Sequence, residues 1–253
     1  MSQPAGDGPE ATQSLEPEPE PLRGSGKPAA AKPWSMLREI AGILVASILV
    51  SLFIKTFVVQ AFFVPSGSME PTLHGCTGCL NDRLLVNKQT SLMGGVHRGD
   101  VVVFRDPGGW LPQSSASASP SRAHEALVFI GLAPTSNENN LVKRVIGVGG
   151  DTVEGRGGKV YVNGSELNEP YVFPGDTPSP TDFRVTVPAD SLWVMGDHRS
   201  DSSDSRSHRA DPGKGFIPVE DVVGRAFVIV WPLNRTGGLE RPATFDRWAT
   251  DGR

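Results

Sequence analysis

Phe63-Val64-Pro65-Ser66-Gly67-Ser68-Met69-Glu70-Pro71-Thr72-Leu73 separates a long apolar run from a remainder that has the pattern of short strands. Proline fixes φ at about −65° and pushes the residue before it toward extended conformations, so both serines are predicted to lie on a stiff, non-helical backbone. Gly67 allows another part of the chain to approach closely. This backbone suits a reactive site with Ser68 as nucleophile, although an ordinary turn after a membrane anchor fits the same residues.

Residues 36–59 are predicted to form a transmembrane helix. The stretch Ile40–Ile54 carries no charge and, continued to Val59, is long enough to cross a hydrocarbon core of about 30 Å. Lys55 lies near one end of the span, where its stem can reach the headgroups. A buried helix of a soluble protein is the alternative. No site of the small-x-small type follows at Val59–Phe63, so the helix is interpreted as an uncleaved anchor.

The flanks of this helix predict its orientation. Residues 1–35 are rich in Pro, Glu, Gly and Ala and are expected to form a disordered cytoplasmic tail. Basic residues precede the span, whereas after Lys55 the next Lys or Arg is Arg83, so the positive-inside rule places the amino terminus in the cytoplasm. Residues 60–253 then form a domain outside the plasma membrane, with Ser68 within about 30 Å of the bilayer. Its substrate is expected to be bound to the membrane as well.

The composition excludes several classes of protein. A net charge of −4 gives no support to a nucleic-acid partner, and two cysteines do not make a disulfide-built scaffold. Cys76-Thr77-Gly78-Cys79 has CxxC spacing, but a redox motif calls for a βαβ context, so a local disulfide or two free thiols is favoured. His74 is near, yet the spacing matches no standard zinc site, and neither a metal nor a cofactor is expected.

The chain after Leu73 is predicted to be mainly β, because short β-branched and aromatic runs alternate with Gly, Pro and Asp. Asn163-Gly164 is a hairpin signal, and the Ser/Ala-rich segment 112–121 indicates a flexible insertion. The expected strands are Arg83–Lys88, Asp100–Phe104, Leu141–Ile146, Lys159–Val162, Arg184–Val187, Leu192–Met195 and Ala226–Trp231.

A serine nucleophile needs a base, and the sequence offers two candidates. Lys143 lies between Leu141 and Val145 on one face of its strand; if that face is buried, the pKa of the lysine falls toward the range of a general base. An exposed edge lysine is the plainer alternative. His198 allows a Ser-His-Asp triad on paper, but the segment 194–206 is better interpreted as a polar loop in which Asp204 and Arg206 pair.

Together these pieces resemble a bacterial type I signal peptidase, with a CxxC variant associated with actinobacterial members. The resemblance runs from the anchor to about Ala226 and rests on motifs that follow the family's order. They are Val64–Leu73, Arg98–Phe104, Val142–Gly147 with Gly150-Asp151, Met195–Asp197 with Asp204–Arg206, and Val223–Ala226. His198 departs from the Asn that is frequent in the family.

The resemblance implies a membrane-bound serine endopeptidase that removes signal peptides from exported preproteins. In it Ser68 attacks the scissile carbonyl and neutral Lys143 takes the serine proton. The implied supporting residues are Ser66 and the Ser68 N–H in the oxyanion hole, Ser202 on the lysine amine, and Asp204 with Arg206 bracing the site. His198 then has no catalytic part.

The resemblance also implies the fold and the specificity. The expected fold is a single transmembrane helix followed by a large twisted antiparallel β catalytic domain with a smaller β-rich insertion, assigned to residues 108–140 and part of 155–182. Cleavage is expected after small residues of the Ala-x-Ala type, in shallow pockets lined by Val64, Pro65, Met69, Leu73, Leu141 and Val142. Two alternatives remain: a Ser/Lys peptidase of the self-cleaving repressor type, which would be soluble, and a non-catalytic, membrane-tethered β domain.

Overall fold

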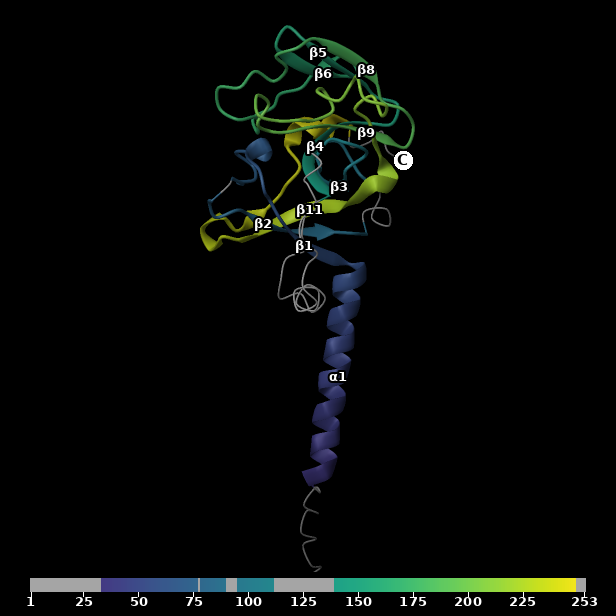
Figure 1. Ribbon diagram of the computed structural model, residues 1–253, viewed down its shortest axis with the longest axis vertical. Coiled ribbons are helices and arrows are strands. Elements are labelled where there is room, and N and C mark those ends of the chain that lie inside the picture. Colours follow the sequence, from purple (N-terminus) through teal and green to yellow (C-terminus); the bar gives the residue numbers. More distant parts are fainter. Residues whose placement is uncertain (1–32, 77, 90–94, 112–138, 249–253) are drawn as a thin grey trace, which may run out of the picture. The chain divides into compact units, whose positions relative to one another are not determined.

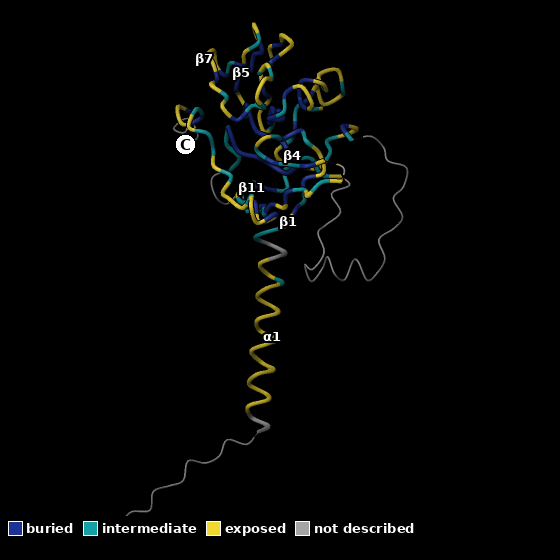
Figure 2. The backbone as a smooth tube through the Cα atoms, turned by 90° about the vertical axis from the view of Figure 1, so that its left-hand side faces the viewer, coloured by how far each residue is buried: buried dark blue, intermediate teal, exposed yellow. Residues whose placement is uncertain are grey.

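The computed structural model describes residues 33–76, 78–89, 95–111 and 139–248, so most of the predicted tail and of the flexible insertion lies outside the described residues. Helix α1 (Pro33–Phe57) contains Met36–Ile54, 19 residues long and apolar enough to cross a membrane. None of these residues is buried, and the backbone of the helix is coloured as exposed along almost its whole length (Figure 2). Its large apolar side chains, among them Ile43, Leu49 and Phe53, are exposed. An exposed surface that is apolar on all sides is typical of a helix surrounded by lipid, and this finding agrees with the predicted membrane anchor.

Within the described residues, an eight-stranded sheet carries most of the β structure, and its described pairs are antiparallel. Its strand order is β1-β2-β11-β3-β4-β9-β10, with β12 paired to β11 (Figure 1). The strands are β1 (Val59–Phe63), β2 (Arg83–Asn87), β3 (Val101–Arg105), β4 (Asn140–Val148), β9 (Ser191–Met195), β10 (Ile217–Pro218), β11 (Val222–Trp231) and β12 (Gly237–Gly238).

A second, four-stranded antiparallel sheet is inserted between β4 and β9 in the sequence, in the order β7-β6-β5-β8 (Figure 1). Its strands are β5 (Thr152–Arg156), β6 (Lys159–Val162), β7 (Ser165–Glu166) and β8 (Phe183–Thr186). Asn163 and Gly164 have φ of 51° and 79°, the left-handed conformation of a tight hairpin turn, as the sequence predicted. The smaller β unit therefore begins before, and ends after, the segment 155–182 expected for it.

The predicted strands are all present, which confirms the mainly β class. Short 3-10 helices lie between strands at η1 (Gly67–Met69), η2 (Val219–Asp221) and η3 (Leu233–Arg235), and η4 (Ala243–Trp248) follows β12. At the start of the predicted insertion, Trp110 is buried and the Asp106 carboxylate accepts hydrogen bonds from the backbone N–H groups of Gly108, Trp110 and Leu111. This part of the segment is a defined turn.

Among the residues that the structure describes, three apolar clusters form the core of the β structure. One joins both sheets and contains Ile146, Val153, Trp193 and Met195. A second contains Phe62, Val64, Met69, Leu73 and Val142 and lies around the segment that carries Ser68. The third lies on the other side of β4 and includes Val145 and Val194. Strand β4 is thus buried on both faces, as expected for a strand inside a sheet between packed layers.

Candidate active site

Ser68 lies in the 3-10 helix η1, so the predicted non-helical backbone is wrong for Ser68 and holds only for Ser66. Ser66 precedes the helix in an extended conformation, with φ −136° and ψ 158°. Met69 and Leu73 turn into the apolar core and fix the segment, while Ser68 is 8% exposed. The Ser68 carbonyl accepts a hydrogen bond of 3.2 Å from the backbone N–H of His198, which ties η1 to the loop after β9.

Lys143 comes from the middle of β4 and reaches the Ser68 side chain. Its Nζ lies 2.6 Å from Ser68 Oγ, and the lysine is 3% exposed. Burial lowers the pKa of Lys143 from 10.5 to about 8, although the carboxylates of Asp204 and Asp197 favour its charged form. A substantial fraction of this amine is therefore neutral near pH 8 and able to accept a proton.

Ser66 lies on the other side of the Ser68 hydroxyl. Its Oγ is 3.3 Å from Ser68 Oγ, and the Ser66 residue is exposed. A hydroxyl in this place can donate to an oxygen that develops negative charge beside Ser68. The structure thus brings Ser66, Ser68 and Lys143 together.

The segment after β9 supplies the other predicted supporting residues. Arg206 donates to Asp204 from Nε at 2.9 Å and from Nη2 at 2.8 Å, and the Gly196 N–H donates to the same carboxylate at 3.0 Å. Burial opposes ionisation of Asp204, but these hydrogen bonds outweigh it and hold the pKa of Asp204 below its ordinary value. The Asp204–Arg206 pair expected from the sequence is therefore formed.

Ser202 is placed differently from what the resemblance implied. Its Oγ is buried, and among the described residues it has no hydrogen-bond partner, so it does not hold the Lys143 amine. The hydroxyl lies close to Gly196, since a Cβ on Gly196 would be 2.2 Å from it. Ser202 thus remains next to the site with its hydrogen-bonding capacity unused.

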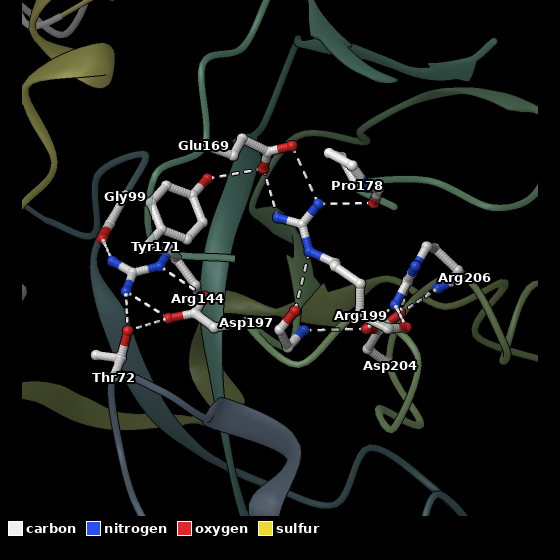
Figure 3. Close-up of polar contacts among 11 residues, drawn as sticks. Thr72, Gly99, Arg144, Glu169, Tyr171, Pro178, Asp197, Arg199, Asp204 and Arg206 are labelled. Carbon is white, nitrogen blue, oxygen red and sulfur yellow. Dashed lines mark hydrogen bonds and ion pairs between the residues drawn. The ribbon is translucent and has the colours of Figure 1, made fainter. Parts of the chain in front are cut away.

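A second ion pair lies beside the serine and was not predicted. Arg144 points to the opposite face of β4 from Lys143 and donates to Asp197 from Nε at 2.8 Å and from Nη2 at 2.6 Å, while Thr72 donates to Asp197 at 2.6 Å (Figure 3). Arg144 also donates to the Gly99 carbonyl at 2.9 Å. Burial opposes the charge of Arg144, but Asp197 reverses the effect, and the pKa of the guanidinium is raised.

The same buried polar network continues through Tyr171 to Glu169 and Arg199 (Figure 3). The Arg144 guanidinium lies 4.2 Å from the centre of the Tyr171 ring, and the Tyr171 hydroxyl donates to Glu169 at 2.8 Å. Arg199 pairs with Glu169 and donates from Nε to the Gly196 carbonyl at 3.0 Å. The loop that faces Ser68 is therefore held by charge-assisted hydrogen bonds, which are stronger than neutral ones.

His198 does not form the alternative triad. Its ring stacks on Phe173 with centroids 4.0 Å apart, and its Nδ1 is buried with no partner among the described residues. Its hydrogen bond to Ser68 is from backbone to backbone. The Ser68 hydroxyl pairs with Lys143 instead.

The residues predicted to line the substrate pockets do not all lie in one place. Val64, Met69, Leu73 and Val142 pack in one apolar cluster beside Ser68. Pro65 is exposed, and Leu141 packs against the cluster on the other side of β4. Alternation along the strand explains this difference, because Leu141 and Val142 point to opposite faces.

Cys76 and Cys79 are joined by a disulfide. The ligating atoms of His74, Cys76 and Cys79 lie within 4.8 Å of one another, but the disulfide occupies both sulfurs. A local disulfide was one of the two states that the sequence favoured, and in this state the cluster holds no thiolate for a metal.

Comparisons with known proteins identify the family of this chain. The sequence pattern of the family described as "Signal peptidase, peptidase S26" matches residues 37–231. A probable signal peptidase I of Mycobacterium leprae is 41% identical and covers 82% of this chain and 81% of its own length. The signal peptidase I of Mycobacterium tuberculosis H37Rv is 42% identical over 80% of this chain and 75% of its own length.

The likeness extends beyond mycobacteria. The signal peptidase I of Leptolyngbya laminosa is 36% identical and covers 90% of this chain and 97% of its own length. The crystal structure of a signal peptidase I from Enterococcus faecalis V583 is 26% identical, covers 51% of this chain and 95% of that chain, and has a TM-score of 0.33. On the family pattern and the sequence relatives, the chain belongs to the signal peptidase family, peptidase S26, and is a serine peptidase of the signal peptidase I type.

Proposed function

We propose that this chain cleaves signal peptides from exported preproteins with Ser68 as nucleophile and neutral Lys143 as general base. The observation that carries the proposal is the 2.6 Å contact between Lys143 Nζ and Ser68 Oγ, two residues that are both buried. A buried amine with a lowered pKa can take the proton that an unassisted serine hydroxyl keeps at neutral pH.

The first half of the reaction follows from these positions. Lys143 removes the proton of Ser68 Oγ while the oxygen attacks the scissile carbonyl. The Ser66 hydroxyl and the Ser68 N–H stabilise the oxyanion, and such a donor contributes about 10²- to 10³-fold in rate. The tetrahedral intermediate collapses when the Lys143 ammonium returns a proton to the leaving amine, and the signal peptide remains as an ester on Ser68.

The second half uses the same groups. Neutral Lys143 removes a proton from water, and the resulting oxygen attacks the ester. The Lys143 ammonium then returns that proton to Ser68 Oγ as the ester bond breaks, so the signal peptide leaves with a free carboxylate and both side chains regain their starting states. The Asp204–Arg206 pair supports the loop that faces Lys143, and its carboxylate limits how far the pKa of the lysine falls.

The anchor and the domain boundaries are part of the proposal. The predicted span ends at Val59, but α1 ends at Phe57 and Val59 begins β1. The cytoplasmic tail is therefore assigned to residues 1–35, the span to residues 36–57 and the extracytoplasmic catalytic domain to the chain from Val59 on, with the orientation taken from the charge asymmetry around α1. Preproteins held in the same bilayer are then the substrates. Val64, Met69 and Leu73 are almost fully buried and support the site from the core, whereas Val142, 8% exposed, is proposed to contact the small residues before the cut.

Cleavage of a model preprotein in liposomes tests this function. The preprotein carries an Ala-x-Ala site, and a matched version carries a bulky residue in place of the last alanine. Mass spectrometry of the products should show a single cut after the alanine and none in the bulky version. Equal cleavage of both, or a cut elsewhere, contradicts the proposed specificity.

A further inference from the structure

The loop between η1 and β2 is held together at its base. We call its described residues, 74–76 and 78–82, the disulfide loop. The Asp82 N–H donates to the His74 carbonyl at 2.9 Å, and the His74 N–H donates to the Asp82 carboxylate at 2.8 Å. Arg235 adds two hydrogen bonds of 2.9 Å to the same carboxylate. The base is thus fixed, and the disulfide between Cys76 and Cys79 closes the rest of the loop.

The backbone of the disulfide loop lies in close contact with the segment that carries Ser66. A Cβ on Gly75 would lie 2.5 Å from the Val64 carbonyl oxygen, 2.7 Å from the Ser66 carbonyl oxygen and 2.9 Å from the Ser66 nitrogen. The residue before Cys76 is therefore in backbone contact with Ser66, whose Oγ is 3.3 Å from Ser68 Oγ. A residue with a Cβ could not approach this closely, so the contact requires glycine at position 75.

A second contact joins the same loop to the other side of Ser68. His74 Nδ1 lies 2.7 Å from Glu70 Oε1, just after η1. The loop thus contacts the chain both before and after the serine, at Ser66 and at Glu70. A change in the conformation of the disulfide loop must reach the geometry of the proposed oxyanion hole.

The disulfide is accessible to a reductant. Cys76 is exposed and Cys79 is half-buried, and the imidazole of His74 is within 4.8 Å of both sulfurs. A histidine beside a cysteine stabilises the thiolate, which is the leaving group and the nucleophile of thiol–disulfide exchange. The chain has two cysteines, so exchange at this site competes with no other thiol of the chain.

We propose that Cys76 and Cys79 form a thiol–disulfide exchange site that sets the rate of the peptidase through Ser66, and that the disulfide form is the active one. The inference rests on the proposed function, because it requires Ser66 in the oxyanion hole. Reduction releases the constraint on Cys76, the residue after Gly75, so that only the base of the loop still holds Gly75 against Ser66. The Ser66 hydroxyl is then less well placed to donate to the oxyanion.

The exchange takes its electrons from a dithiol. A thiolate of that dithiol attacks the exposed Cys76 sulfur, the bond to Cys79 breaks, and the Cys79 thiolate takes a proton. The second thiol of the donor then attacks the mixed disulfide and releases Cys76 as a thiol. The chain gains two electrons and two protons, and the donor leaves as its own disulfide.

The test compares the two redox forms of the full chain in detergent. Dithiothreitol reduces the wild type, and a mass shift with a maleimide verifies that both cysteines are free. Reduction should lower kcat about 10-fold with KM little changed, since complete loss of an oxyanion donor costs about 10²–10³. Reoxidation should restore kcat, which separates the effect from unfolding.

Two sets of variants locate the effect. The kcat of Cys76→Ser/Cys79→Ser should equal that of the reduced wild type and should not change when dithiothreitol is added. Ser66→Ala should have the same low kcat in both redox forms, because the group through which reduction acts is gone.

The outcomes separate this inference from the proposed function. Equal kcat in verified oxidised and reduced wild type, or an effect of dithiothreitol on the double cysteine variant, overturns the exchange site and leaves the peptidase proposal standing. An oxidised wild type that cuts no preprotein overturns the proposed function itself.

Discussion

Lys143 Nζ and Ser68 Oγ are 2.6 Å apart although 75 residues separate them in the sequence. The contact exists because β4 is buried between β3 and β9 and directs Lys143 toward η1. A lysine amine almost fully removed from water is disfavoured in its charged form, which is the property that a general base needs.

The rate should depend on pH through Lys143. Its pKa of about 8 means that the neutral amine, which is the base, is lost as the pH falls. For a peptide substrate without titrating groups, kcat/KM should rise about tenfold per pH unit between pH 6 and 8 and level off above. Stopped assays across this range measure it. A flat profile contradicts a neutral lysine base.

The same burial should make Lys143 costly for stability. Its pKa is about 8 in the folded chain and 10.5 when unfolded, so the folded state binds the proton less well. The unfolding free energy of the wild type should therefore rise with pH between 8 and 10.5. Below pH 8 it should be about 3 kcal/mol lower than above pH 10.5. Lys143→Met removes this penalty, and Asp204 keeps Arg206 as its partner.

Denaturant unfolding in detergent measures this difference. Lys143→Met should exceed the wild type in unfolding free energy at pH 7, and the advantage should shrink toward pH 10. Lys159→Met, at an exposed lysine, is the matched control and should show little of this trend. An advantage of Lys143→Met that does not change with pH would mean that the buried charge of the amine is not its cause.

Removing the partner of Arg144 should destabilise the domain. Asp197→Ala leaves a guanidinium buried without its carboxylate, and such a loss costs about 3–5 kcal/mol. The double variant Arg144→Met/Asp197→Leu should retain more stability than Asp197→Ala, because no charge is left unpaired. Glu166→Ala, in an exposed pair with Lys159, is the control. Chemical unfolding curves measure the unfolding free energy of each variant. An equal decrease for Asp197→Ala and Glu166→Ala would contradict the stabilising role of the buried Arg144–Asp197 pair.

Gly196→Ala should damage the site while sparing most of the fold. A Cβ there would lie 2.2 Å from Ser202 Oγ and 2.4 Å from the Ser68 carbonyl oxygen, so η1 must shift. Displacement of a reacting group by about 1 Å costs roughly 10²-fold in rate. Gly213→Ala, where the nearest atom would be 3.7 Å away, is the matched control. Unchanged kcat in Gly196→Ala would show that Ser68 tolerates the shift.

The strands could be predicted from the sequence because their patterns are local. Lys159–Val162, the Asn163-Gly164 turn and the short strand after it form the hairpin that this dipeptide indicates. Strand β1 is not predicted, since Val59–Phe63 continues the apolar run of the helix and has the composition of its end or of an apolar patch. Only pairing with β2 shows that these residues form a strand.

Strand β5 escapes prediction for another reason. Gly155 interrupts its pattern, and glycine is depleted in strands. The structure shows why glycine is needed there: a Cβ would lie 2.3 Å from Ser179 Oγ and 2.6 Å from Phe183. A close approach of this kind depends on the folded arrangement and leaves no signal in a single sequence.

Sequence motifs predicted which residues belong to the candidate site, but not all of the pairings between them. Ser66, Ser68, Lys143, Asp204 and Arg206 were named from the sequence and lie together in the structure, while their catalytic roles stay proposals. Arg144 and Asp197 lie inside the quoted motifs but have no predicted role, since 53 residues separate them and no local pattern pairs them. The unpartnered hydroxyl of Ser202 depends on side-chain rotation, which strand patterns do not describe.

Single-turnover cleavage of the Ala-x-Ala preprotein tests the central claim most directly, with wild type, Ser68→Ala, Lys143→Ala and the control Lys159→Ala. Near-UV circular dichroism verifies that each variant is folded. The wild type and Lys159→Ala should cut at similar rates, and Ser68→Ala and Lys143→Ala should lose at least about 10³-fold. Folded Lys143→Ala that cuts at the rate of the wild type would contradict the Ser68–Lys143 mechanism.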